Sequence, residues 1–307
     1  MSDMNRERVA VIIPALNAGE QWLDWIAGMR MQNRQPDEVL VVDSSSDDDT
    51  VGIARREGYR VHTISRADFN HGRTRQMAVE LLDGIDIAVF LTQDAILVDE
   101  SSLGNLVSSF ENSKVGMAYG RQLPRRQAGL FEAHARLFNY PDVSRLRTMD
   151  DVPELGLKTA YTSNSYAAYR LSALKEVGGF PDNVIVSEDM HVAARMLLAG
   201  WAVHYNAAAT VEHSHSYTMR QEFQRYFDVG VFLSRNAWIP QRFGYPGGEG
   251  KRFFASEFHY VGIRGLYRIP FSIIRSGLKY FGYCLGRNEQ RLPVSLKRKI
   301  SMQKAFW

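Results

Sequence analysis

The stretch IAVFLTQDA, residues 87–95, decides the fold of this chain. Five apolar residues followed by a polar step that ends in Asp94 indicate a buried parallel strand, which delivers one carboxylate at its carboxyl end. Ligands of open α/β sheets bind at that edge. A carboxylate there either caps the following turn or binds a hard divalent cation, which commonly brings a phosphate with it.

Further apolar runs on both sides of this stretch predict the other strands of the sheet. Those before it alternate with helical patterns, which indicates right-handed βαβ units and a parallel sheet. We expect a helix at 188–198 and one or two strands within 159–169. Residues 121–153 lack clear periodicity and predict a mobile segment with short helices, where an acceptor would enter. The remaining strands are expected at 9–13, 39–42, 60–64, 115–119 and 203–211.

The composition limits the class of protein. The chain has 307 residues, enough for one large domain or for a domain with an appendage. Its single cysteine, Cys284, excludes an internal disulfide framework and a cysteine-based zinc cluster, and fits a reducing compartment. A polar N-terminus and the lack of a long apolar run predict neither a signal peptide nor a transmembrane helix. We therefore expect a cytoplasmic protein.

The charge is unevenly distributed along the chain. Residues 216–307 contain 16 Lys and Arg and 5 Asp and Glu, a balance of +11. Residues 1–215 contain 21 basic and 29 acidic residues, a balance of −8. An acidic N-terminal part and a basic, aromatic-rich C-terminal part indicate two different binding partners.

The turn after the first strand carries no glycine-rich phosphate-binding motif. It reads Pro14-Ala15-Leu16-Asn17, which excludes a dinucleotide fingerprint, and a P-loop is absent as well. The first strands instead bring Pro14, Ala15 and Asp43 side by side at the sheet edge. There a carboxylate can accept a hydrogen bond from a base or a ribose hydroxyl. The alternative for Asp43 is an N-cap or turn residue.

Two further groups of residues have the chemistry to bind phosphate or metal. Arg73 and Arg75 follow Gly72, and arginine suits bidentate phosphate contacts while glycine permits close backbone approach. The alternative is an ordinary surface helix start. His213 and His215 point to the same face of an extended segment and could complete a metal shell or touch a diphosphate. A pair of solvated histidines is the alternative.

Four motifs in order resemble the family 2 glycosyltransferases. They are VIIPALN at 11–17, VVDSSSDDDT at 41–50, FLTQD at 90–94 and SED at 187–189, and the match covers about residues 8–215. The loop DFNHGRTR at 68–75, HSH at 213–215 and the basic aromatic C-terminal part are similar to the bacterial rhamnosyltransferases. That branch builds lipopolysaccharide core, O-antigen or related polysaccharides.

The resemblance implies an α/β fold of the GT-A type with a mostly parallel central sheet in residues 1–215, followed by a C-terminal helical extension in 216–307. It implies inverting sugar transfer with Asp189 as the general base. Asp189 could instead be an ordinary first-turn acid favoured by the helix dipole. The implied nucleotide and donor contacts are Pro14, Ala15, Asn17, Asp43, Ser45, Gly72, Arg73, Arg75, Thr92 and Gln93.

The family's Asp-x-Asp metal motif is altered in this chain. It reads Thr92-Gln93-Asp94, so one carboxylate is kept and the other is replaced by a hydroxyl. One carboxylate with two diphosphate oxygens and waters can still hold Mg²⁺ or Mn²⁺. The implied metal ligands are Asp94, His213 and His215.

We expect an inverting glycosyltransferase that moves L-rhamnose from dTDP-L-rhamnose to a lipid-linked or lipopolysaccharide acceptor. Another nucleotide sugar is one alternative, and a non-catalytic sugar-nucleotide-binding assembly subunit is another, prompted by Thr92. A nucleic-acid partner is not expected, because the basic part has no recognition motif and its aromatics alternate with aliphatic runs. That part fits a segment peripheral to the inner face of the cytoplasmic membrane. Its aromatics could instead pack on the catalytic domain.

Overall fold

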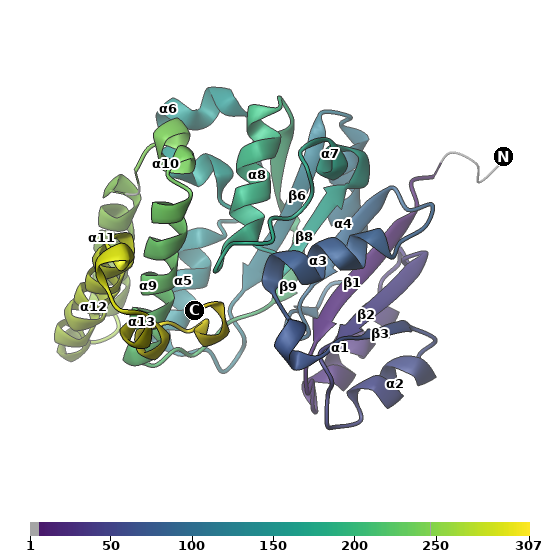
Figure 1. The fold of residues 1–307 in the computed structure, drawn as a ribbon, viewed down its shortest axis with the longest axis horizontal. Helices are drawn as coiled ribbons and strands as arrows, with labels where there is room; N and C mark the ends of the chain where they lie inside the picture. The colour runs from purple at the N-terminus through teal and green to yellow at the C-terminus, as the bar shows by residue number, and fades with distance from the viewer. Residues whose placement is uncertain (1–5, 246) are drawn as a thin grey trace.

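The computed structural model describes residues 6–245 and 247–307. Its nine-stranded sheet has the order β3-β2-β1-β4-β8-β6-β9-β5, with β7 paired to β9, and it runs through the middle of the molecule (Figure 1). The strands are β1 (Val9–Ala15), β2 (Glu38–Asp43), β3 (Arg60–Thr63), β4 (Ile87–Leu91), β5 (Ile96–Leu97), β6 (Val115–Leu123), β7 (Arg145–Arg147), β8 (Tyr166–Arg170) and β9 (Ala202–Glu212).

The first half of the sheet is parallel, as the sequence predicts. Strands β1 to β4 pair in parallel, with β1 between β2 and β4. The connecting helices are α1 (Gln21–Arg30), α2 (Thr50–Arg56) and α3 (His71–Glu80). Parallel strands bring their carboxyl ends to one edge, so the loops that follow β1, β2 and β4 are neighbours.

The second half of the sheet is mixed. Strand β8 lies antiparallel between β4 and β6, while β6 and β9 are parallel. The prediction of strands across 159–169 is therefore only half right. Residues Gly156–Ala160 form a 3-10 helix, and the strand begins at Tyr166.

Residues 121–153 are packed, which contradicts the predicted mobile segment. They include the end of β6, helix α5 (Leu130–Asn139) and β7. Arg147, in β7, is buried, lies 4.9 Å from the Tyr119 ring centroid and donates a 2.8 Å hydrogen bond to the Tyr161 carbonyl. A buried arginine held by tyrosines stabilises this segment, and such contacts leave no periodic hydrophobic pattern.

Both faces of the sheet are covered by helices, because successive strand residues point to opposite sides. Val9, Val11 and Ile13 belong to one core, with α1, α2 and α4 (Ser102–Ser108). Ile12 belongs to the other core, with α3, α7 (Leu171–Glu176) and α8 (Glu188–Leu198). This second core continues into the C-terminal helices, which therefore fold against the sheet domain.

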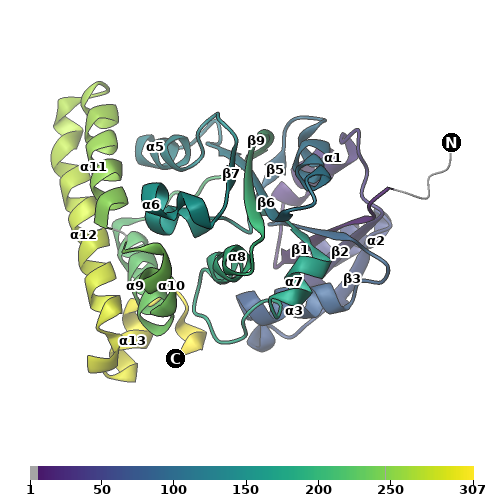
Figure 2. The same cartoon turned by 90° about the horizontal axis from the view of Figure 1, so that it is seen from above.

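The C-terminal helices lie at the end of the molecule opposite β2 and β3, with α11 and α12 outermost (Figure 2). They are α9 (Met219–Arg235), α10 (Trp238–Phe243), α11 (Gly247–Gly262), α12 (Ile269–Arg287) and α13 (Val294–Ile300). Helices α9 and α12 approach very closely. A Cβ on Gly286 would lie 2.0 Å from the Phe227 carbonyl oxygen, and one on Gly230 would lie 2.3 Å from the Tyr283 carbonyl oxygen. Glycine at these two positions permits this packing.

Candidate active site

Hydrogen bonds connect the loop after β1 to the loop after β4 at the carboxyl edge of the sheet. The Oε1 atom of Gln93 accepts from the Leu16 N–H at 2.8 Å, and its Nε2 donates to the Leu16 carbonyl at 3.1 Å. Each end of the amide keeps one further hydrogen-bonding position, so the donor contact predicted for Gln93 remains a prediction. Its role here is to hold the two loops in place.

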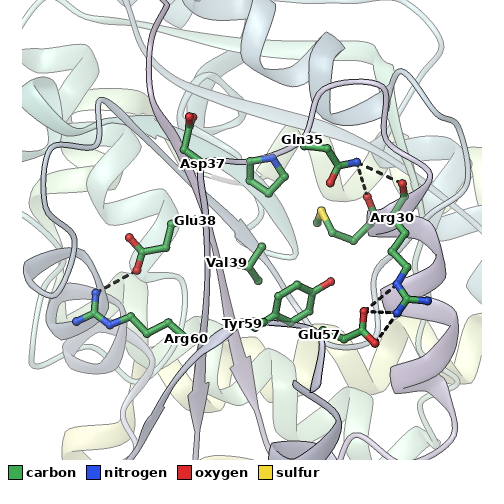
Figure 3. A pocket seen from close by; sticks show the side chains of 11 residues that line it. Arg30, Gln35, Asp37, Glu38, Val39, Glu57, Tyr59 and Arg60 are labelled. Atoms are coloured by element: carbon green, nitrogen blue, oxygen red, sulfur yellow. Dashed lines mark hydrogen bonds and ion pairs between the residues drawn. The ribbon is translucent and has the colours of Figure 1, made fainter. Parts of the chain in front are cut away.

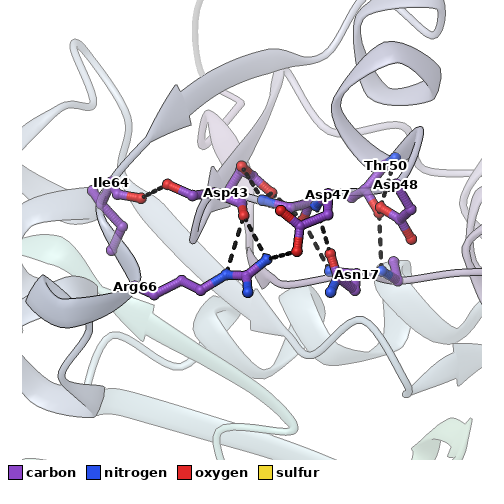
Figure 4. Close-up of polar contacts among 10 residues, drawn as sticks. Asn17, Asp43, Asp47, Asp48, Thr50, Ile64 and Arg66 are labelled. Carbon is purple, nitrogen blue, oxygen red and sulfur yellow. Dashed lines mark hydrogen bonds and ion pairs between the residues drawn. The ribbon is translucent and has the colours of Figure 1, made fainter.

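Hydrogen bonds also tie the loop after β1 to the loop after β2 (Figure 4). The Asn17 N–H donates to Ser46 Oγ at 2.8 Å, and Asn17 Oδ1 accepts from the Asp47 N–H at 2.8 Å. Asp48 accepts from the Gly19 N–H at 3.0 Å. The two loops therefore form one braced wall, and Asn17 is one of its braces.

Asp43 stabilises this wall by hydrogen bonds to Ser46. It ends β2 in register with Ala15, and Pro14 pairs with Val42, so the three predicted residues are neighbours. The Asp43 side chain is 1% exposed, and its carboxylate accepts from the backbone N–H and the hydroxyl of Ser46. The nucleotide contact predicted for Asp43 remains a prediction, and it requires Ser46 to move aside.

The strained backbone of the described chain is concentrated here. Asn17, Ser45 and Ser187 are the non-glycine residues with positive φ in residues 6–245 and 247–307, at 47°, 60° and 62°. Two lie in the braced wall, and Ser187 directly precedes helix α8. Non-glycine residues persist in this conformation only where surrounding contacts impose it, typically at functional sites.

The three predicted metal ligands lie together. Nε2 of His213 is 3.4 Å from Asp94 Oδ2, and Nε2 of His215 is 3.6 Å from the same oxygen. All three ligand atoms lie within 4.8 Å of one another, a spacing that fits one cation between them. The group forms because β4 ends just before Asp94 and β9 ends just before the histidines.

The electrostatic state of this group favours a cation. His213 Nδ1 lies 2.9 Å from Gln122 Oε1, which places a proton on Nδ1 and directs Nε2 towards Asp94. Burial lowers the pKa of His213 and lowers the pKa of His215 to about 4. Burial by itself would raise the pKa of Asp94, but the contact with His213 holds it well below its usual range. The site thus offers one carboxylate and two imidazoles, which are suitable ligands for a divalent cation.

Asp189 lies in the first turn of α8, and two backbone N–H groups hold its carboxylate. Oδ2 accepts from Asn164 at 3.0 Å and Oδ1 from Met190 at 2.7 Å. Burial, and after it the charge of Glu188, raise the pKa of Asp189 to about 7. A carboxylate whose pKa lies near the working pH is well suited to take a proton from a hydroxyl.

Glu188 is the buried partner of Arg75, and the phosphate contact predicted for Arg75 remains a prediction. Arg75 Nη1 lies 3.2 Å from Glu188 Oε1, and the two side chains are only 6% and 7% exposed. Moving Arg75 to a ligand would leave a buried carboxylate unpaired, at a cost of about 3–5 kcal/mol. Burial opposes ionisation of Glu188, but Arg75 outweighs it and lowers the pKa of Glu188. Arg75 thus maintains the charge that raises the pKa of Asp189.

The start of α3 packs against the backbone at Pro181. A Cβ on Gly72 would lie 1.8 Å from the Pro181 carbonyl oxygen, so this glycine accommodates backbone packing, and the phosphate contact predicted for it remains a prediction. Asn70 caps the helix by accepting from the N–H groups of Gly72 and Arg73 at 3.0 and 3.1 Å. The exposed Arg73 donates to the Asp68 carbonyl at 2.9 Å, and its donor contact stays a prediction.

Backbone hydrogen bonds connect the Asp94 group to Asp189. The N–H of Thr92 donates to the Ser165 carbonyl at 3.2 Å, and the preceding residue, Asn164, holds Asp189. The Thr92 hydroxyl is itself buried, so it is poorly placed for the predicted donor contact. The proposed base and the predicted metal ligands consequently lie at one edge of the sheet.

Arg125 is a site residue that the sequence analysis missed. Its Nη2 donates to the Asp94 carbonyl at 2.5 Å and lies 3.3 Å from Gln21 Oε1. A guanidinium beside the metal ligands is well suited to a diphosphate. Arg125 belongs to the segment without periodicity, where its richness in arginine was the only signal.

A surface hollow at the other edge of the sheet is the rival site (Figure 3). It lies beside the start of β2 and β3, away from the carboxyl ends of the strands. Arg30 pairs there with Glu57 at 2.6 Å, and Arg60 pairs with Glu38 at 3.0 Å. Because these charges are already paired, the hollow offers little to a charged substrate.

Comparison with known proteins agrees with the geometry at the carboxyl edge. Residues 10–178 match the family model described as Glycosyl transferase family 2. The O-antigen chain rhamnosyltransferase WbaN of Salmonella anatum is 44% identical over 298 residues, covering 97% of this chain and 95% of its own. The O-antigen chain rhamnosyltransferase RfbN of Salmonella typhimurium strain LT2 is 43% identical over 301 residues, covering 98% and 96%.

A solved structure supports the fold independently. The mannosyltransferase PcManGT from Pyrobaculum calidifontis, determined with GDP-Man and Mn²⁺, aligns with a TM-score of 0.65. The alignment covers 94% of this chain and 89% of the other at 17% identity, so the likeness concerns the fold alone. It confirms the predicted GT-A architecture.

Proposed function

The chain belongs to the family 2 glycosyltransferases, and from this premise we propose that it transfers L-rhamnose from dTDP-L-rhamnose to a lipid-linked or lipopolysaccharide acceptor in O-antigen synthesis. The observation that carries the mechanism is the placement of Asp189, with a pKa raised to about 7, on the same sheet edge as Asp94 and its histidines. The two relatives that match almost the whole chain are both rhamnosyltransferases by name, which supports the choice of sugar.

The residues divide the reaction between two sides of the transferred sugar. Asp189 accepts the proton of the acceptor hydroxyl, whose oxygen attacks the anomeric carbon and inverts it. The donor's diphosphate leaves on the other side, beside Asp94 and Arg125. A bound divalent cation would act there as a Lewis acid for the charge of the leaving diphosphate.

We assign the cation to Asp94, His213 and His215. Two imidazoles in the ligand set disfavour Mg²⁺, which prefers oxygen ligands and keeps its waters. Mn²⁺ accepts a mixed set, and PcManGT was solved with that ion. Transfer by metal-stripped protein should accordingly be restored better by Mn²⁺ than by Mg²⁺.

A donor screen tests the proposed function. Purified protein is incubated with dTDP-L-rhamnose, other dTDP-, UDP- and GDP-sugars and a membrane extract of glycan acceptors, and release of the nucleoside diphosphate is measured. Release with dTDP-L-rhamnose alone supports the proposal. Release with another sugar only would reassign the donor, and binding without turnover would indicate the non-catalytic alternative.

The reaction rate should rise with pH. Asp189 must be ionised to accept a proton, so kcat/KM is expected to fall about tenfold per pH unit below pH 7 and to level off above it. The pKa of His215 is lowered to about 4, so its own titration lies outside a pH 6–8 window. The measurement is a pH–rate profile at saturating metal. A flat profile from pH 6 to 8 would remove Asp189 from the role of base.

We further propose that the outer face of α12 rests on the membrane that holds the acceptor. In the described residues, no helix combines the length and the hydropathy that a membrane crossing requires. Exposed apolar side chains instead recur along α12 and in the turn that precedes it. With their exposed fractions they are Leu266 (73%), Tyr267 (76%), Ile273 (50%), Ile274 (53%), Tyr280 (71%) and Phe281 (59%).

The positive charges around the α11–α12 turn favour an anionic lipid surface as the binding partner of this face. Arg264 lies 3.6 Å from the Tyr260 ring centroid, and Arg268 donates to the Tyr267 hydroxyl at 2.9 Å. In the described part of the chain neither forms an ion pair with a carboxylate. Arginines beside exposed apolar groups suit anionic headgroups at the acyl boundary.

Binding to vesicles provides the test of this surface. We expect the protein to pellet with vesicles of anionic phospholipid at low salt and to be released as salt rises, because headgroup attraction is screened. Replacing Ile273 and Tyr280 with serine should abolish pelleting, whereas the same change at Val143, exposed elsewhere, should not. Dimer formation without vesicle binding would identify the face as an interface between copies instead.

A further inference from the structure

Helix α9 contributes one more arginine, Arg225, near the proposed metal ligands. The His215 ring is 5.3 Å from the ring of Tyr217, and Arg225 Cζ is 5.7 Å from the centroid of the Tyr217 ring. His215 is itself 3.6 Å from Asp94. A continuous path of side chains thus leads from the proposed metal ligands to a guanidinium on the C-terminal extension.

Arg225 is exposed, although protein groups surround it on several sides. The Tyr217 ring contacts both Arg225 and His215, so the guanidinium lies one aromatic side chain away from the proposed metal ligands.

Within the described residues no carboxylate lies close enough to Arg225 to form an ion pair. The nearby carboxylate of Asp228 accepts instead from the Ser301 hydroxyl at 2.7 Å and the Met302 N–H at 2.9 Å. Two other arginines of this region form hydrogen bonds with protein oxygens. Arg136 bonds to Gln122, and Arg125 bonds to the Asp94 carbonyl.

We propose that Arg225 binds the diphosphate of the nucleotide, so that the C-terminal extension completes the donor site. This rests on the proposed function, because it takes the donor to be a nucleotide sugar. The leaving diphosphate gains negative charge as its bond to the sugar breaks, and the altered motif at Thr92 leaves one carboxylate to hold a cation there. A fixed positive charge would stabilise the leaving diphosphate in addition to the cation, and arginine binds phosphate in a bidentate manner.

Nucleotide binding by the full-length protein tests this proposal. Dissociation constants for dTDP and thymidine are measured calorimetrically with Mn²⁺ for the wild type, Arg225→Ala and Arg225→Lys. Arg220→Ala is the matched control, because Arg220 is exposed on the same helix. For Arg225→Ala we expect dTDP binding to weaken about 10- to 100-fold while thymidine binding stays unchanged. Arg225→Lys should lie between the two.

The possible outcomes separate this proposal from the proposed function. Unchanged dTDP binding by Arg225→Ala, or equal losses for dTDP and thymidine, would overturn the role of Arg225 alone. A wild-type protein that binds none of dTDP, UDP and GDP would overturn both. Thermal unfolding of each variant checks folding, which should be unaffected because Arg225 makes no hydrogen bond or ion pair within the described residues.

Discussion

Asp189→Asn is expected to lower kcat about 10²–10⁴-fold while the dissociation constant of the donor stays unchanged. The amide keeps the shape of the carboxylate but cannot take the acceptor's proton. The measurement is sugar transfer under single-turnover conditions, together with calorimetric binding of dTDP. Asp182→Asn, an exposed change just before α8, is the control and should keep full activity. Full turnover by Asp189→Asn would remove this residue from the mechanism.

The same substitution should stabilise the folded protein at high pH. The pKa of Asp189 is raised in the fold from 3.8 to about 7, so its stabilising contribution is complete below pH 4 and is lost as the pH rises through 7. Asparagine avoids the burial of a charge, so the melting temperature of Asp189→Asn should exceed that of the wild type at pH 8 and match it more closely at pH 4. An inactive but more stable variant cannot owe its inactivity to unfolding.

Asp94→Asn is the second change with a large expected effect. It removes the only carboxylate of the proposed metal group, and we expect kcat to fall about 100-fold or more and the stimulation by Mn²⁺ to disappear. Binding of Mn²⁺ without nucleotide is measured in parallel by electron paramagnetic resonance. Asp83→Asn, at an exposed position, is the control. If Asp94→Asn binds Mn²⁺ as the wild type does, Asp94 is not a ligand.

The sequence predicted the parallel half of the fold because its signals are local. Apolar runs such as residues 87–91 and helical spacing such as that of Trp22 and Ile26 need no knowledge of distant residues. The same holds for Asp94, which follows the end of a buried strand. Asp189 was predicted from the resemblance of residues 187–189 to the family motif and not from a local structural signal.

The contacts that the sequence did not predict depend on a distant partner. Arg75 is predicted to contact phosphate, and nothing near it in sequence reveals its pairing with Glu188. Gly72 is predicted to contact phosphate as well, and nothing near it reveals its close approach to the Pro181 carbonyl. Such contacts become visible only when the chain is folded.

The order of strands in the sheet also determines when the protein can become an enzyme during synthesis. Strands β1 to β4 complete their mutual pairing within the first 91 residues, so the braced wall formed by the loops after β1 and β2 can fold early on the ribosome. Strand β5 lacks its partner until β9 emerges more than 100 residues later and pairs with it. The two histidines follow β9 directly, so a nascent chain can bring them beside Asp94 only after β9 has been synthesised.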